Sequence, residues 1–276
     1  MKSQGTFTKK DIVVTLACLI FLLASLGAIG ASGRRRAKEA LCLSNLRQWG
    51  VCFQLYASDN EGYFMEGWIQ GSTTPYDESK VYWMEALRQY YRNPDLRCCP
   101  EAAIPGTELG LGEYGVGGGP FSAWGVFSGT WSYSVPGDYG SYGWNGYVAN
   151  PPPGEGIWNP ERKDYNWRRA NVNGADNIPL LLDHQFVDCW PAEHDEPPMY
   201  DGQPWSTTSQ MGRCCINRHS GYVNSAFLDF SARRVGLKEL WTLKWHRQYD
   251  TCGIWTICRG MVPNDWPEWM RDFKDY

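Results

Sequence analysis

Two sets of side chains in this sequence could perform chemistry: ten cysteines, and a run of carboxylates and histidines between residues 183 and 201. Ca²⁺ binds six to eight oxygen atoms, and a loop rich in carboxylates can supply them. The carboxylates that we consider for such a site are Asp183, Asp188, Glu193 and Asp195. The D-x-D-x-D-G spacing of a calcium loop is absent, so a solvated acidic loop is the competing interpretation.

Zinc binding and enzymatic chemistry receive less support. A zinc site would need His184, His194, His219 and the Cys214–Cys215 pair to converge, and no C-x-x-C or H-x-x-x-H spacing favours this. We interpret His219 as a hydrogen-bonding residue. A G-x-S-x-G motif is missing, and the G-x-G-x-x-G match follows Ile-Pro-Gly rather than a strand. We therefore expect a non-enzymatic protein with no cofactor, unless the acidic loop binds Ca²⁺.

The cysteines favour an oxidising compartment, where such a number is common. We predict a disulfide between Cys252 and Cys258. The connectivity of the other cysteines stays open, and reduced, buried cysteine is the alternative interpretation.

The elements that position these residues begin with an uncharged run from Ile12 to Ala31. At about 1.5 Å per residue this run spans roughly 30 Å, the thickness of a bilayer core. It predicts a transmembrane helix over 12–33 after a leader-like segment over 1–11. A cleaved signal sequence and a buried core helix are the alternatives.

The helix is expected to continue as an amphipathic segment over 34–62, because apolar residues recur there every three or four positions. Its packing face is predicted to hold Leu43, Leu46, Trp49 and Phe53. Further on, the pattern predicts a helix over 81–92, a buried strand from Asn177, alternating strands over 222–235, and helices over 236–246 and from Pro267.

The two ends of this pattern resemble type IV pilin-like proteins, especially the type II secretion pseudopilin-like proteins of the Planctomycetes type. The resemblance covers about residues 7–62, 94–100 and 217–235. Phe230 stands where that family has glycine, so we expect a different turn geometry there. The matching residues are Phe7, Thr8, Asp11, Arg34 to Lys38, Cys42, Asn45, Leu46, Arg47, Gln48, His219, Gly221, Asn224, Phe227 and Asp229.

This resemblance implies an α+β, pilin-like fold, in which the long N-terminal helix packs on a small antiparallel sheet and residues 63–276 form the ectodomain with a C-terminal helical extension. It implies assembly through Phe7 and Asp11, the latter paired with a neighbouring subunit's N-terminal amine. It also implies a disulfide from Cys42 to Cys98 or Cys99.

For the cell, the resemblance implies a single-pass inner-membrane protein with its ectodomain in the periplasm or at the surface, and N-methylation after leader processing. The expected partners are copies of itself or related pilin-like subunits, membrane lipid and inner-membrane components of a secretion system. The expected function is assembly into a secretion-associated or pilus-like fibre.

The alternative function is a membrane-anchored surface protein that binds polysaccharide. Aromatic side chains stack on sugar rings, and a glycine-rich block over 105–156 contains Trp124, Trp131 and Trp144. The competing interpretation is that these rings replace aliphatic core residues. A net charge of -4 gives no basis for binding nucleic acid.

Overall fold

The computed structural model describes residues 8–67, 82–106, 117–127, 136–152, 164–204 and 209–276; of residues 22–29 and 31 it describes the backbone only. Phe7, Trp131 and the G-x-G-x-x-G match over 110–115 lie outside the described residues. The chain divides into two compact units, Met1–Lys38 and Glu39–Tyr276. The boundary between the units falls within the first helix.

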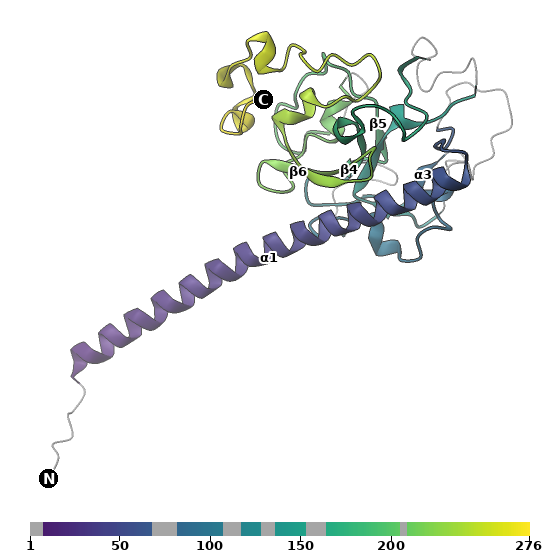
Figure 1. Cartoon of the computed structure of the whole chain (residues 1–276). Helices are drawn as coiled ribbons and strands as arrows, with labels where there is room; N and C mark the ends of the chain where they lie inside the picture. Colours follow the sequence, from purple (N-terminus) through teal and green to yellow (C-terminus); the bar gives the residue numbers. More distant parts are fainter. Residues whose placement is uncertain (1–7, 68–81, 107–116, 128–135, 153–163, 205–208) are drawn as a thin grey trace. The chain divides into compact units, whose positions relative to one another are not determined.

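The first helix, α1, runs from Lys9 to Asp59 (Figure 1). Its start is fixed by a reciprocal cap: the Asp11 carboxylate accepts hydrogen bonds from the Thr8 amide and hydroxyl at 2.8 and 2.7 Å, while the Thr8 hydroxyl accepts from the Asp11 amide at 3.3 Å. The helix ends where Gly62, at φ 84°, donates its amide to the Ala57 carbonyl at 2.7 Å.

In the described part of the chain, no helix has both the length and the apolar character needed to cross a membrane. Three predictions are therefore wrong. They are a transmembrane helix over 12–33, a pilin-like fold whose first helix spans the bilayer, and a single-pass inner-membrane location.

The second part of α1, from Glu39 onward, packs on the globular unit with one face. Leu46, Trp49 and Phe53 are fully buried, which confirms them as packing residues. Leu43 is only half-buried, and Cys42 occupies the core-facing position instead. The buried positions 42, 46, 49 and 53 keep the four-three spacing of one helical face.

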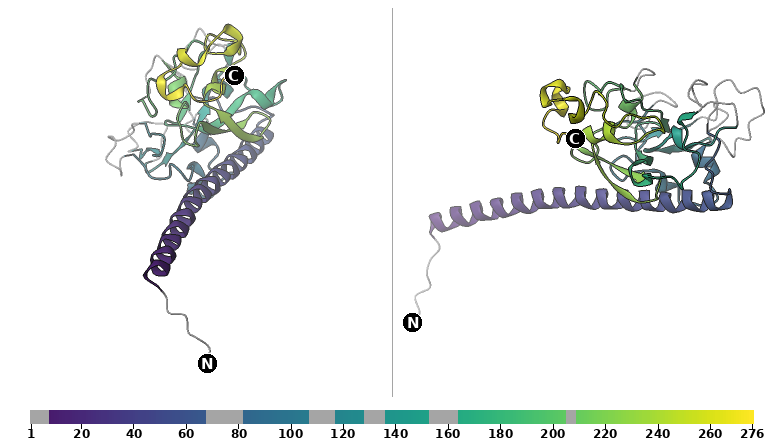
Figure 2. Two further views of the ribbon diagram at one scale, coloured as in Figure 1. Left: turned by 90° about the vertical axis from the view of Figure 1, so that its left-hand side faces the viewer. Right: turned by 45° about the horizontal axis from the view of Figure 1, so that its top comes forward.

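This face lies along a five-stranded sheet of order β5-β3-β4-β6-β7 (Figures 1 and 2). The central strand β4 is buried along its whole length and pairs antiparallel with both β3 and β6. It confirms the strand predicted after Asn177. A separate two-stranded sheet pairs β1 with β2. The strands are β1 Trp124–Gly125, β2 Tyr139–Gly140, β3 Tyr142–Asn145, β4 Pro179–Asp183, β5 Asp188–Cys189, β6 Tyr222–Phe227 and β7 Ala232–Gly236.

Strands β6 and β7 form the predicted hairpin, with Tyr222 opposite Gly236 and Ala226 opposite Ala232. Phe230 adopts φ 67° in its turn, which is the conformation that glycine usually supplies. The phenylalanine itself adopts the strained backbone, and the expected difference from the family's turn stays a prediction. Its ring packs partly buried against the core.

The remaining helices are short. The predicted helix over 81–92 is reduced to α3, Trp83–Ala86, within the described residues. The predicted helix over 236–246 is a 3-10 turn, η6, because Lys244 turns away to donate its amide to the Asn177 carbonyl at 3.0 Å. The 3-10 elements are η1 Pro94–Arg97, η2 Gly146–Val148, η4 Ala175–Asn177, η5 Met211–Arg213, η6 Lys238–Thr242, η7 Ile257–Arg259, η8 Pro263–Asp265 and η9 Glu268–Met270.

Candidate functional site

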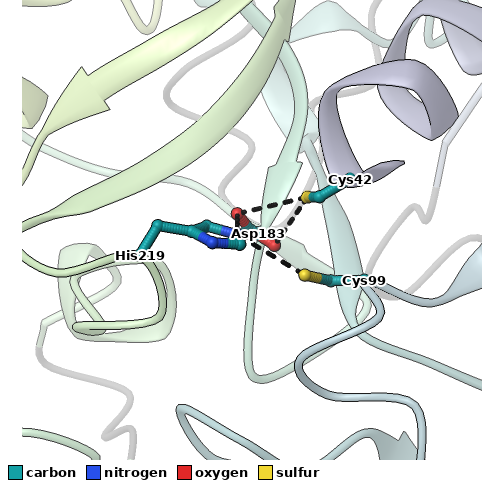
Figure 3. Close-up of side chains that lie close together, drawn as sticks. All are labelled: Cys42, Cys99, Asp183 and His219. Carbon is teal, nitrogen blue, oxygen red and sulfur yellow. Dashed lines mark hydrogen bonds and ion pairs between the residues drawn. The ribbon is translucent and has the colours of Figure 1, made fainter. Parts of the chain in front are cut away.

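Four chemically reactive side chains meet where α1 crosses the sheet (Figure 3). Cys42 comes from the buried face of α1, and Cys99 follows η1. Asp183 ends β4, and His219 lies in the turn before β6. All four are buried, and their sulfur, oxygen and nitrogen atoms all lie within 4.8 Å of one another.

His219 Nε2 is the atom that links this cluster. It lies 3.0 Å from Asp183 Oδ2 and 3.4 Å from Cys99 Sγ. Cys42 Sγ lies 3.6 and 3.7 Å from the two Asp183 oxygens. The thiols, the imidazole and the carboxylate therefore face one shared point.

Buried donors hold the Asp183 carboxylate in place. Arg218 donates from Nη1 to Asp183 Oδ1 at 3.0 Å, and the backbone N–H of Asn224 donates to Oδ2 at 2.8 Å. The same guanidinium donates to the carbonyls of Ser141 and His184 at 2.6 and 3.1 Å. This network fixes the carboxylate and its position on the sheet.

Protonation follows from these contacts. Burial opposes ionisation of Asp183, but the positive charges of His219 and Arg218 hold its pKa well below the usual range. Burial would lower the pKa of His219, but the Asp183 carboxylate raises it to about 10. Burial raises the pKa of Cys42, whereas hydrogen bonds from Cys42 and His219 lower that of Cys99 despite its burial. The contacts therefore ease ionisation of Cys99 beside a protonated His219.

This arrangement is unlike a nucleophilic catalytic triad. In a triad the two imidazole nitrogens contact different partners, the nucleophile and the carboxylate. Here the single atom His219 Nε2 contacts both, and the Cys99 side chain is fully buried. A pocket beside α1, lined by residues such as Tyr90 and Asp95, includes none of the four.

The carboxylates considered for Ca²⁺ are not brought together. Asp188 pairs with Arg213 at 2.8 Å, and Asp195 accepts three backbone amides. Glu193 lies 3.7 Å from His246 Nε2. Among the described residues, Asp183 alone of the four joins a group of three or more metal-binding side chains, because the others have separate partners.

The cysteines follow the predictions in part. The disulfide between Cys252 and Cys258 is formed, which confirms that prediction. The bridge from Cys42 to Cys98 or Cys99 is not formed, and all three are free, buried thiols. Cys98 is not a member of the cluster, and burial raises its pKa to about 12.

A second buried group joins His184, Cys189 and Cys214. The His184 Nδ1 contacts the Phe186 carbonyl at 2.6 Å, and the buried Nε2 has no hydrogen-bond partner among the described residues. With three potential ligands it offers a less complete site than the first cluster.

The sequence placed His219 beside the hairpin and considered Asp183 only for Ca²⁺, so it missed their meeting with Cys42 and Cys99. The signal was present in the resemblance: its three segments, 7–62, 94–100 and 217–235, each contribute one member of the cluster.

Two of the three tryptophans considered for polysaccharide binding lie among the described residues, and both are buried. Trp124 is fully buried and Trp144 is 3% exposed, so neither presents a ring face to solvent. No family model, curated protein or solved structure matches this chain.

Proposed function

We propose that this chain is a non-enzymatic assembly subunit whose first helix packs against copies of itself in a fibre. One observation carries this proposal: in the first unit, the large apolar side chains of α1 stand in solvent. Each of them is at least half exposed. They are Ile12 51%, Val13 66%, Val14 61%, Leu16 54%, Leu19 52%, Ile20 62% and Phe21 73%.

The positions of these residues favour several neighbours over one. At about 100° per residue they spread over an arc of roughly 220° around the helix, which is wider than the stripe of an ordinary amphipathic helix. A single partner helix covers only one stripe. Burying one such side chain fully is worth about 1.5–3 kcal/mol, so several copies of the segment together gain a large driving force.

Asp11 adds a charged group beside this segment. Its carboxylate is exposed, and hydrogen bonds from Thr8 lower its pKa, so it is ionised at neutral pH. It both caps its own helix and offers a negative charge to a neighbouring subunit. We propose that Asp11 contributes to assembly by pairing with a positive charge of the neighbouring subunit. The role of Phe7 in assembly stays a proposal that rests on the resemblance to pilin-like proteins.

Light scattering on the purified full chain tests this function. Wild type should form species larger than a monomer, and Ile20→Glu should reduce the mass to that of the monomer, because a buried carboxylate would lack a partner. Leu55→Glu is the matched control, since Leu55 is a 47% exposed residue on the same helix outside the segment. A monomeric wild type, or equal effects of the two substitutions, would contradict the proposal.

A further inference from the structure

We propose that Cys42, Cys99, Asp183 and His219 form a tetrahedral zinc site that joins α1 to the sheet. Thiolate sulfur, imidazole nitrogen and carboxylate oxygen are the donors that Zn²⁺ takes in proteins. Here two sulfurs, one nitrogen and one oxygen converge from four separate segments. This set completes four-coordination without solvent.

The spacing of the donor atoms fits that geometry. Zinc bonds of roughly 2.0–2.3 Å place the ligand atoms of a tetrahedron about 3.3–3.8 Å apart. Cys42 Sγ to Asp183 Oδ2 is 3.7 Å, and Cys99 Sγ to His219 Nε2 is 3.4 Å. The contact from His219 Nε2 to Asp183 Oδ2, at 3.0 Å, needs to lengthen by a few tenths of an ångström.

The charges also balance. Two thiolates and the Asp183 carboxylate carry three negative charges, and Zn²⁺ with the Arg218 guanidinium carries three positive charges, while His219 binds as a neutral imidazole. A buried site requires such compensation, because an unpaired charge in the interior is costly.

Arg218 then acts as an outer partner of the site. Arg218 forms an ion pair with Asp183 Oδ1, so Oδ2, which faces His219, is the oxygen that would bind zinc. Arg218 itself is anchored by backbone carbonyls, including those of Ser141 and Gly119 at 2.6 and 3.0 Å. Such second contacts orient metal-binding carboxylates.

The role of this zinc is structural. All four ligands come from the protein and are buried, whereas catalytic zinc keeps one position for water or substrate. The ion would fasten the helix to β4 and to the turn before β6. Zinc binding by the native fold therefore adds to its stability.

Metal analysis of the reduced full chain tests the site. Wild type reconstituted with Zn²⁺ and then dialysed should retain about one zinc per chain. Cobalt substitution should give thiolate-to-metal charge-transfer bands and the visible spectrum of a tetrahedral site. Cys99→Ala should lose both signals, and Cys98→Ala is the matched control, because Cys98 is a neighbouring buried free thiol outside the cluster.

A chelator gives a second readout if Cys99→Ala does not fold. Removing the metal from the wild-type chain should lower its melting temperature, and Zn²⁺ should restore it. The proposal is overturned by a reduced wild type that retains no zinc, by a Cys99→Ala chain that keeps the cobalt spectrum, or by equal losses in the two alanine variants. The last two results would point to the group of His184, Cys189 and Cys214 or to nonspecific binding.

Discussion

Asp188 and Arg213 form an ion pair inside the globular unit, and it shows how burial changes the value of a charge. The two side chains are 6% and 2% exposed and lie 2.8 Å apart. Asp188→Ala should lower the free energy of unfolding by about 3–5 kcal/mol, because it leaves a buried guanidinium without its counter-charge. Asp250→Ala, which breaks an exposed pair with Arg259, should have little effect. Urea denaturation of the two variants measures the difference.

The same pair should respond to pH. Burial raises the pKa of Asp188 to about 6, above its ordinary value of 3.8, although Arg213 opposes the shift. A raised pKa means that the folded chain holds this proton while the unfolded chain releases it. The part of the stability that comes from holding this proton is therefore complete below pH 3.8 and is lost as the pH rises through 6, while the contact with Arg213 persists. The stability of wild type relative to Asp188→Ala should fall between pH 4 and 7; a rise over that range would contradict the assignment.

Individual residues of the candidate site were visible in the sequence, but their combination was not. His219 was correctly placed beside the hairpin, and Cys42 was singled out on the helix. Asp183 was considered only for a Ca²⁺ site, which the fold does not form. Asp188, the next carboxylate of that set, is instead paired with Arg213. Cys42 and Asp183 are 141 positions apart, and only tertiary packing brings them to 3.6 Å.

Among the secondary elements, the close crossing of α1 over the β6–β7 turn depends on Gly50. A Cβ atom there would lie 2.7 Å from the Phe230 carbonyl oxygen. Gly50→Ala should therefore destabilise the chain by about 1–3 kcal/mol through overpacking, against a helix propensity gain of about 1 kcal/mol.

Gly33→Ala is the control for that substitution, because it changes the same residue in the same helix with nothing within 4 Å of the new atom. It should leave the thermal midpoint unchanged or raise it. Equal midpoints for the two variants would show that the helix tolerates a side chain at the crossing.

Elements with strong local patterns were predictable. The four-three spacing located the packing face of α1 within one residue, and alternation located the β6–β7 hairpin. The extents of the shorter helices were not predictable, because contacts with distant parts of the chain determine where these helices end. Lys244, for example, leaves the predicted C-terminal helix to pair with the Asn177 carbonyl.

At the scale of the whole molecule, the two units differ in which side chains they bury and which they expose. The globular unit buries its reactive groups around Cys42 and Asp183, where α1 meets the sheet. The first unit instead leaves apolar side chains from Ile12 to Phe21 in solvent. The prediction of a membrane span over 12–33 rested on the length of the uncharged run. The described residues carry no such span. Under the function that we propose, their exposed apolar surface contacts other subunits.

Photo-crosslinking in intact cells tests that assignment most directly. A photoreactive amino acid at Ile20 of the full chain should yield crosslinked dimers and larger multiples of the same chain, while the same group at Leu55 should not. Crosslinks from Ile20 that contain no second copy of the chain, or equal self-crosslinking from the two positions, would contradict assembly through the first helix.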